Sequence, residues 1–346
     1  MSEFHTLAVS EVNKETPNSV SITFDVPEKL KTEFAFKAGQ YITIKHQKDG
    51  KELRRAYSIC SSPKSGMLKI AVKKVAKGEF SVFANNGLKA GDLLQVMPPT
   101  GKFILEPNLK SYVAFAAGSG ITPVLSLIKS TLEEMPQSSF LLIYGNQNVE
   151  ETMFYSEILE LQKQFPDRFA AEFIFSRKEE ENSKFGRIDR SIVNFFLKNK
   201  YKETTYEAFY LCGPEEMIDE VSATLKSNGI NSKQIHHELF STAEKGLLVE
   251  MHDGFTSVTV TLDDEEETFQ MPQTKSILEA ALDEGLDPPY SCQGGICSTC
   301  IARLKEGKAE MRKNQILTEA EIADGLILTC QAHPTTAKVV VDYDDV

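Results

Sequence analysis

The sequence predicts a multidomain α+β protein with an antiparallel β-barrel, a doubly wound parallel α/β domain and a small C-terminal domain. Three observations predict this fold class. The chain has 346 residues, more than a single hydrophobic core usually serves. Its hydrophobic pattern changes at Ser111, and four of its six cysteines lie near the C-terminus. We expect domains at 1–106, 107–240 and 249–346, with a linker at 241–248.

The first domain consists of short β-branched and apolar runs separated by turn residues. Such runs occur at 20–24, 41–44, 68–72 and 93–96. Short runs of this kind with turn signals between them are typical of antiparallel sheets. We therefore expect an antiparallel barrel.

The second domain begins with the buried run SYVAFAA, which is followed by the turn GSG and by a helical pattern in ITPVLSLIKSTLEEM. Further strands are expected at 140–144, 171–175 and 208–212, with helices between them such as 154–164. Alternation of strands and helices indicates a parallel, doubly wound sheet. Such a sheet binds its ligands at the carboxyl ends of its strands.

The third domain is expected to begin with a hairpin at 257–271, which turns at the acidic residues 263–267, and to continue with a helix at 275–284. Residues 249–346 contain 19 Asp and Glu against 7 Lys and Arg, which accounts for the whole net charge of −12. This acidic field disfavours nucleic acid and suits a basic patch on a partner protein. Simple solubility is the alternative explanation.

The cysteine cluster is the strongest chemical signal in the sequence. Its spacing is C-x4-C-x2-C with a fourth cysteine further on, which is the plant-type pattern for a 2Fe–2S cluster. Gly294 and Gly295 allow backbone amides to approach the sulfurs closely. A structural zinc site and inert buried cysteines are the alternatives. The expected metal ligands are Cys292, Cys297, Cys300 and Cys330.

The composition argues against a membrane protein, because no run approaches the roughly 20 apolar residues that span a bilayer. The opening MSEFHTLAVSEVNKE has neither the basic nor the apolar part of a secretion signal, so we expect a cytoplasmic location. Thiols remain reduced there, which favours metal ligation over disulfides.

Three short motifs precede the cysteines in a fixed order: RAYS at 55–58, GSGITP at 118–123 and CGP at 212–214. In this order the chain resembles the ferredoxin–NADP reductase superfamily fused to a C-terminal plant-type ferredoxin, over nearly its entire length. The strings ETPNSVSITFDVP, GQYITIK, LRRAYSICSSP and VMPPTGKF are most similar to the reductase subunits of phenylacetyl-CoA epoxidases. The resemblance implies a flavin-binding barrel, an NAD(P)-binding α/β domain and a β-grasp ferredoxin domain.

The resemblance implies that Tyr57 stacks on the flavin ring, Ser58 forms a hydrogen bond near flavin N5, and Arg55 neutralises a phosphate. An aromatic face, a hydroxyl and a planar cation suit these tasks. From the residues alone, RAYS is also compatible with an ordinary strand end. FAD is expected, with FMN as the alternative. Further flavin-site residues implied by the resemblance are Ala56, Val72, Lys73, Lys74, Gly78, Glu79, Phe80 and Ser81.

The GSG turn lies between a strand and a helix, where backbone amides approach a pyrophosphate. Its expected cofactor-binding residues are Gly118, Ser119, Gly120, Thr122 and Pro123. Cys212 is followed by Gly213 and Pro214 at the end of another buried strand, and the resemblance places it beside the nicotinamide. A small buried hydrophobe is the alternative for Cys212, and Cys60 is interpreted in that way outright.

The choice of nicotinamide cofactor depends on Ser176, Arg177 and Arg187, which provide a hydroxyl and two cations for an adenosine 2′-phosphate. They favour NADPH over NADH, although a surface ion pair would also explain Arg187. Near the end of this domain, the resemblance implies that Phe240 shields the flavin and that Glu238 relays a proton. The catalytic candidates are therefore Ser58, Cys212, Glu238 and Phe240.

The expected path runs from NADPH through FAD and the 2Fe–2S cluster to an oxygenase component met by the acidic C-terminal domain. For the family that the chain resembles, this acceptor is a di-iron oxygenase that epoxidises phenylacetyl-CoA. One alternative is a reductase for another oxygenase or hydroxylase. A second alternative is a cluster-bearing redox sensor that does not turn over NADPH.

Overall fold

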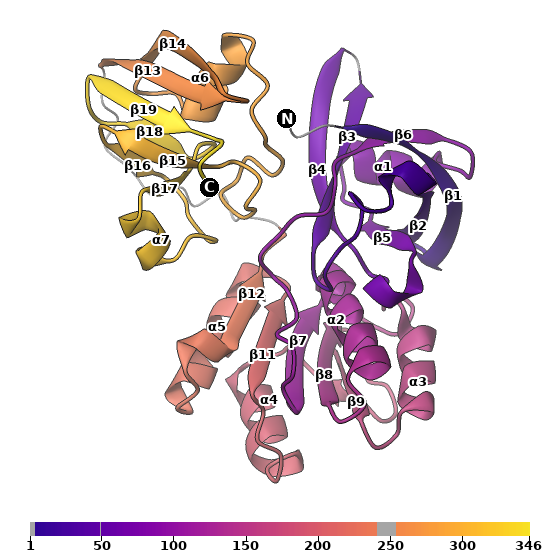
Figure 1. Cartoon of the computed structure of the whole chain (residues 1–346). Coiled ribbons are helices and arrows are strands. Elements are labelled where there is room, and N and C mark those ends of the chain that lie inside the picture. Colours follow the sequence, from indigo (N-terminus) through magenta and orange to yellow (C-terminus); the bar gives the residue numbers. More distant parts are fainter. Residues whose placement is uncertain (1–3, 49, 241–253) are drawn as a thin grey trace. The chain divides into compact units, whose positions relative to one another are not determined.

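The computed structural model describes residues 4–48, 50–240 and 254–346, and its elements are labelled in Figure 1. The expected linker at 241–248 lies outside the described residues. The described chain forms two compact units. One contains residues 5–48 and 57–240, and the other contains Phe4, residues 50–56 and residues 254–346.

The N-terminal region forms an antiparallel sheet of six strands in the order β4-β3-β6-β1-β2-β5. A bridge between Ile59 and Ile70 connects the segment after β4 to β5, so the sheet closes on itself. This confirms the antiparallel architecture predicted for the first domain. The strands are β1 (His5–Thr16), β2 (Ser19–Asp25), β3 (Tyr41–Lys48), β4 (Lys51–Ser58), β5 (Leu68–Lys73) and β6 (Leu93–Val96).

Period-two alternation explains why this sheet closes around a core. In β5, for example, Leu68, Ile70 and Val72 are at most 2% exposed, whereas Lys69 and Lys73 between and beyond them are partly accessible. The eight-residue helix α1 (Glu79–Asn86) follows β5 and buries Phe80 and Ala84.

The middle region forms a parallel sheet of six strands in the order β10-β9-β8-β7-β11-β12. The predicted parallel sheet is therefore confirmed, but β10 and β12 were not predicted as strands. The strands are β7 (Ser111–Ala117), β8 (Ser139–Asn146), β9 (Phe169–Phe175), β10 (Lys184–Phe185), β11 (Ala208–Cys212) and β12 (Ile235–Glu238).

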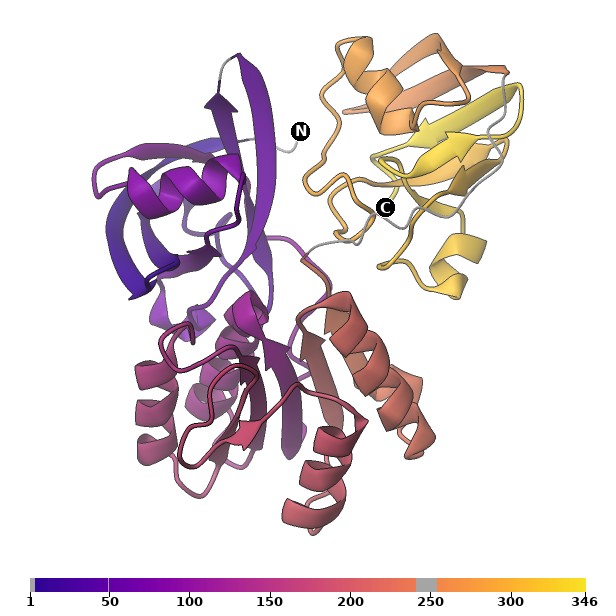
Figure 2. The ribbon, with the colours of Figure 1, turned by 180° about the vertical axis from the view of Figure 1, so that it is seen from behind.

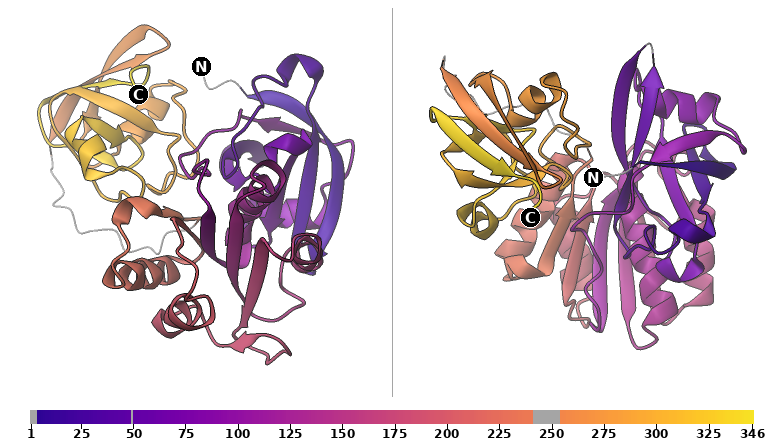
Figure 3. Two further views of the ribbon diagram at one scale, coloured as in Figure 1. Left: turned by 60° about the horizontal axis from the view of Figure 1, so that its bottom comes forward. Right: turned by 45° about the horizontal axis from the view of Figure 1, so that its top comes forward.

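Helices lie on both sides of the parallel sheet (Figures 2 and 3). Tyr112, Ala114 and Ala116 of β7 share one core with apolar residues of α2. The alternate residues Val113 and Phe115 are also fully buried, so the opposite face is covered as well. Burial on both faces explains the nearly continuous apolar run of SYVAFAA. The helices are α2 (Ile121–Glu134), α3 (Tyr155–Gln164), α4 (Arg190–Phe195) and α5 (Glu215–Ser227).

The C-terminal region contains a five-stranded sheet in the order β14-β13-β19-β15-β17. The hairpin of β13 and β14 was predicted, and β19 pairs with β13 in parallel, as in a β-grasp fold. Helix α6 (Ile277–Asp283) contributes Ile277, Ala280 and Ala281 to the core of this sheet. The strands are β13 (Phe255–Leu262), β14 (Glu265–Pro272), β15 (Ile301–Glu306), β17 (Leu326–Leu328) and β19 (Lys338–Asp342).

The C-terminal region also contains the two-stranded sheet of β16 (Ala309–Met311) and β18 (Ala332–Pro334), and the short helix α7 (Glu319–Ala323). Across the described parts of the chain, every helix is too short or too polar to cross a lipid bilayer.

Candidate functional site: a flavin, nicotinamide and iron–sulfur constellation

The strand β4 ends in the residues predicted to hold the flavin ring. Tyr57 is half-buried, and its ring centroid lies 5.4 Å from that of Phe80 at an interplanar angle of 42°. Phe80 itself is only 2% exposed, so it supports the Tyr57 ring from the barrel core. The arrangement leaves Tyr57 as a fixed aromatic surface, which suits stacking against a flat ring system.

The first turn of α1 provides the predicted phosphate site. Gly78 at the N-cap offers no side chain to the helix amides, so the positive end of the helix dipole has no side-chain cap. The Ser81 hydroxyl already forms a hydrogen bond within this segment, because it accepts from the Val75 amide at 3.1 Å. Lys74 is an exposed cation just after β5, so this helix end and its surroundings fit an anionic flavin phosphate. Arg55 is also exposed, and its predicted role at the phosphate stays a prediction.

The remaining residues predicted for the flavin site differ in how far they are buried. Val72 is fully buried and pairs with Val20, so its side chain belongs to the barrel core. Ala56 is partly exposed, and Glu79 is exposed in the first turn of α1. Lys73 is partly buried, and its side chain extends toward the GSG turn. A Cβ atom placed on Gly118 would lie 3.7 Å from the Lys73 Nζ atom.

The GSG turn approaches the end of β11 so closely that only glycine fits. A Cβ on Gly120 would collide with the carbonyl oxygen of Cys212. Thr122 is buried and donates a 3.0 Å hydrogen bond to the Ser119 carbonyl, which closes the first turn of α2. Pro123 is buried in the same turn, where its missing N–H costs nothing. The turn and the CGP motif therefore lie side by side at the carboxyl edge of the sheet.

At this edge Ser58, Cys212 and Glu238 come together. Cys212 of β11 pairs in register with Glu238 of β12, and Ser58 donates a 3.1 Å hydrogen bond to the Glu238 carboxylate. Ser58 is 4% exposed and Glu238 is 7% exposed. Burial, with the nearby Glu238 charge, raises the pKa of Cys212 well above its ordinary value. Cys212 is therefore a neutral thiol, which suits an apolar ring contact and argues against nucleophilic chemistry.

Beyond Cys212, the CGP motif leads directly into α5. Pro214 is the N-cap of this helix, and a Cβ on Gly213 would press against Met217 and Ala117. Phe240 follows β12 and is 38% exposed, so it is an accessible aromatic residue at the end of the unit. Its predicted role as a flavin shield stays a prediction.

The residues predicted to read the 2′-phosphate lie at the other end of the same sheet edge. Phe185 of β10 pairs in parallel with Phe175 of β9, so continuing the register places Gly186 beside Ser176. Arg177 and Arg187 then follow on adjacent strand ends, and both are exposed. The Ser176 hydroxyl donates to the Asn146 carbonyl at 3.3 Å.

Sequence reasoning missed Phe185 as a member of this group. Phe185 is 58% exposed and immediately precedes Gly186 and Arg187. An exposed aromatic ring beside two arginines suits a nucleobase with an attached phosphate. The signal was available as an aromatic residue before Gly-Arg, but its meaning depended on the two-residue strand β10 that the sequence does not reveal.

The four cysteines of the C-terminal motif associate as two pairs. Cys292 forms a hydrogen bond to Cys297, which raises the pKa of Cys292 and lowers that of Cys297 to about 6. Cys300 forms a hydrogen bond to Cys330, which together with burial raises the pKa of Cys300. Among the residues that the structure describes, no three His, Cys, Asp or Glu side chains are grouped as ligands of a single metal ion.

The C-x4-C-x2-C spacing with a distant fourth cysteine fits a two-iron cluster better than zinc, whose sites usually have two short Cys or His pairs. The loop geometry agrees. Gly295 has φ of +70°, and a Cβ there would meet the Lys313 carbonyl oxygen. The Gly294 amide donates to the Cys292 sulfur at 3.3 Å, as expected for amides that stabilise a thiolate ligand. The residues present therefore fit a 2Fe–2S cluster.

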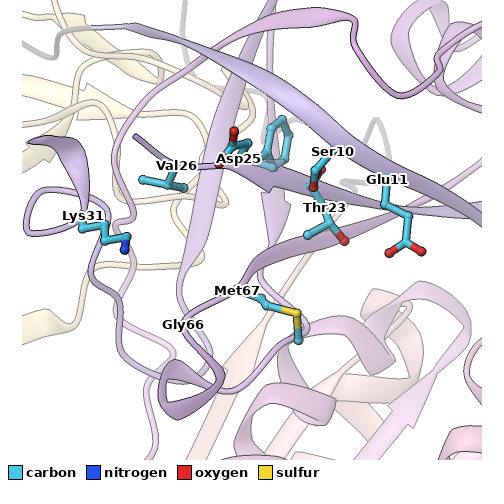
Figure 4. Close-up of a pocket in the computed structure, with 9 residues that line it drawn as sticks. Ser10, Glu11, Thr23, Asp25, Val26, Lys31, Gly66 and Met67 are labelled. Carbon is cyan, nitrogen blue, oxygen red and sulfur yellow. Dashed lines mark hydrogen bonds between the residues drawn. The ribbon is translucent and has the colours of Figure 1, made fainter. Parts of the chain in front are cut away.

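An open pocket of about 550 Å³ lies on the barrel, lined by residues such as Thr23, Lys31 and Met67 (Figure 4). None of its lining residues was predicted as part of a cofactor site. Cys60 is also separate from the site, because it is fully buried and burial raises its pKa to about 12.

Comparison with known domain families matches all three regions of the chain. Residues 6–104 match the oxidoreductase FAD-binding domain, residues 115–223 match the oxidoreductase NAD-binding domain, and residues 260–335 match the 2Fe-2S iron-sulfur cluster binding domain. The fusion of these three domains was predicted from the motifs and is confirmed.

Several characterised proteins are similar over nearly the whole chain. One subunit of the 1,2-phenylacetyl-CoA epoxidase of Escherichia coli is 39% identical over 99% of this chain and 99% of its own length. The ferredoxin reductase component of 3-ketosteroid-9-alpha-monooxygenase from Rhodococcus rhodochrous is 31% identical over 97% of this chain and 96% of its own. Phthalate dioxygenase reductase shares the fold, with a TM-score of 0.61 and 24% identity over 98% of both chains.

Replacing Cys297 by serine tests the predicted cluster ligands. Loss of one thiolate should remove the cluster and lower cytochrome c reduction by roughly 100-fold or more. Ferricyanide reduction, which the flavin supports directly, should remain unchanged. Cys60→Ser is the matched control and should retain iron and both activities. Iron analysis and the two assays check this expectation, and equal loss of both activities in Cys297→Ser would contradict it.

Proposed function

Because the chain belongs to the family of oxidoreductases that includes this Escherichia coli epoxidase component, we propose that it carries electrons from NADPH to an oxygenase that epoxidises phenylacetyl-CoA. The chain is an NAD(P)H-dependent oxidoreductase with FAD-binding, NAD-binding and 2Fe-2S domains. Its role as the reductase component of an oxygenase is supported by the relatives that carry that description. A di-iron oxygenase as acceptor is part of the proposal.

The hydrogen bond between Ser58 and Glu238 carries the proposal. Ser58 ends the flavin motif of the barrel, and Glu238 lies opposite Cys212 at the nicotinamide edge of the parallel sheet. The two motifs predicted to hold the two rings of a hydride transfer therefore converge on one buried point. A sensor that does not turn over NADPH would have no need of this convergence.

When bound, the flavin accepts a hydride from the nicotinamide and passes the electrons singly to the 2Fe–2S cluster. The protein contributes mainly position. Tyr57 presents a flat surface, the amides of α1 would hold a phosphate, and the GSG turn would admit the pyrophosphate of the nicotinamide cofactor. The Ser58 hydroxyl holds its proton toward the Glu238 carboxylate, and the neutral Cys212 thiol adds no competing charge.

NADPH is proposed as the donor because two exposed arginines and a serine lie together at the adenosine end of the sheet edge. No acidic side chain is among the predicted residues there to bind a bare ribose. FAD is proposed as the flavin, in line with the FAD-binding domain that the barrel matches. The domain limits of 1–106, 107–240 and 249–346 also remain proposals, which the family matches support.

Replacing Arg177 or Arg187 by alanine should raise the KM for NADPH by about tenfold for each residue, because each loses a charge-assisted contact to the 2′-phosphate. The KM for NADH should not change, since that cofactor lacks the phosphate. Arg190→Ala, on the first turn of α4, is a matched control with no expected effect. Steady-state kinetics with both cofactors decide the point, and parallel changes for NADPH and NADH would refute the assignment.

Reconstitution with a purified phenylacetyl-CoA epoxidase oxygenase component tests the acceptor. NADPH oxidation should become coupled to formation of the epoxide, measured by chromatography of the CoA products. The Cys297→Ser variant should support no coupling, because electrons must leave through the cluster. Absence of epoxide with active wild-type reductase, together with coupling to a different oxygenase, would show that the acceptor was assigned wrongly.

A further inference from the structure

Arg54, the residue before the predicted flavin arginine, is buried in the unit that contains the cysteine cluster. Its side chain is 3% exposed, and residues 50–56 belong to the same compact unit as residues 254–346. The guanidinium donates to Glu52 at 2.7 Å and to Asp287 at 2.6 Å. It also lies 4.1 Å from the centre of the Tyr290 ring.

Such burial requires compensation, because an unpaired guanidinium away from water is strongly unfavourable. Two carboxylates and an aromatic face supply most of it, and only the second terminal nitrogen, Nη1, has no hydrogen-bond partner among the described residues. The Phe4 ring lies on the same guanidinium at 4.9 Å. Arg54 is therefore tightly held and has no freedom to reach a flavin phosphate.

The two consecutive arginines thus have different tasks. Successive side chains of a strand point to opposite faces, so Arg54 and Arg55 of β4 diverge. Arg55 is exposed and donates to the Arg54 carbonyl at 2.7 Å, which fixes its backbone neighbour. Of the two, Arg55 alone remains for the phosphate.

The contacts of Arg54 lead directly to the cluster loop. Asp287 and Tyr290 lie five and two residues before the first ligand, Cys292. Tyr290 is 8% exposed and packs in one core with Cys300 and Cys330. Its hydroxyl also lies 3.4 Å from the Glu52 carboxylate. Holding the Tyr290 ring therefore holds one side of the core that contains two predicted cluster ligands.

We propose that Arg54, clamped by Asp287, Glu52 and Tyr290, is a latch that holds the loop before the cluster ligands in place within the compact unit of residues 50–56 and 254–346. Arg54 is a positioning residue, not a catalytic one. The step that it serves is the transfer of one electron from reduced flavin to oxidised cluster, in which no bond forms or breaks. The inference rests on the proposed function for its kinetic consequence only.

The test compares Asp287→Asn, Tyr290→Leu and Arg54→Met in the full-length holoprotein. Asp287 is 69% exposed in its side chain, so its replacement removes the ion pair without threatening the fold. Arg303→Met is the matched control, since Arg303 also pairs with two carboxylates in the same unit, Asp324 at 3.0 Å and Asp345 at 3.2 Å. Flavin and iron contents are measured for every variant.

Two readouts are used. Amide hydrogen exchange of the peptide covering 286–292, recorded without NADPH, should rise in the three latch variants and remain at the wild-type level in Arg303→Met. Rapid mixing with NADPH should show flavin reduction at the wild-type rate but cluster reduction slowed by roughly tenfold or more, since small misplacements cost about that much.

Unchanged exchange in 286–292 for both Asp287→Asn and Arg54→Met would overturn the latch, whatever the kinetics. Wild-type cluster reduction in variants with increased exchange would overturn its role in electron transfer. Failure of the wild-type flavin to be reduced by NADPH would instead contradict the proposed function, and the exchange data would still decide the latch.

Discussion

The buried hydrogen bond between Ser58 and Glu238 is the contact on which the arrangement of the site depends. It joins the last residue of the barrel strand β4 to the last residue of the edge strand β12. The following barrel segment is fixed to α2 in the same way, because Ser126 donates to the Ser61 carbonyl at 2.7 Å and Lys129 to the Cys60 carbonyl at 3.3 Å. The flavin and nicotinamide motifs therefore share one rigid junction.

The cluster site depends instead on the interactions among its cysteine thiols. Cys292, Cys297 and Cys300 lie in one short loop, and interaction with a neighbouring cysteine raises the pKa values of Cys292 and Cys300. The predicted ligands Cys292, Cys297, Cys300 and Cys330 fit a cluster of two irons in number and chemical type. Thiolate ligands suit iron in a 2Fe–2S cluster, which would exchange single electrons at this site.

Much of this organisation could be predicted from the sequence, because β7, β8 and β11 are nearly continuous apolar runs and the cysteines have a distinctive spacing. The strands β10 and β12 could not be predicted, since two and four residues give no periodicity and their pairing depends on β9 and β11. Phe80 was expected at the flavin but is buried behind Tyr57, which only the packing of α1 reveals. The contact between Arg54 and Asp287 joins residues 233 positions apart, beyond any local pattern.

Anaerobic titration of the purified holoprotein with NADPH, followed by visible absorbance and electron paramagnetic resonance, tests the central claim most directly. The claim is that one chain accepts hydride at a flavin and delivers single electrons to a 2Fe–2S cluster. The account predicts bleaching of the flavin bands together with a rhombic 2Fe–2S signal. Bleaching of the flavin without that signal would contradict the internal path, and no bleaching with NADPH or NADH would contradict the reductase itself.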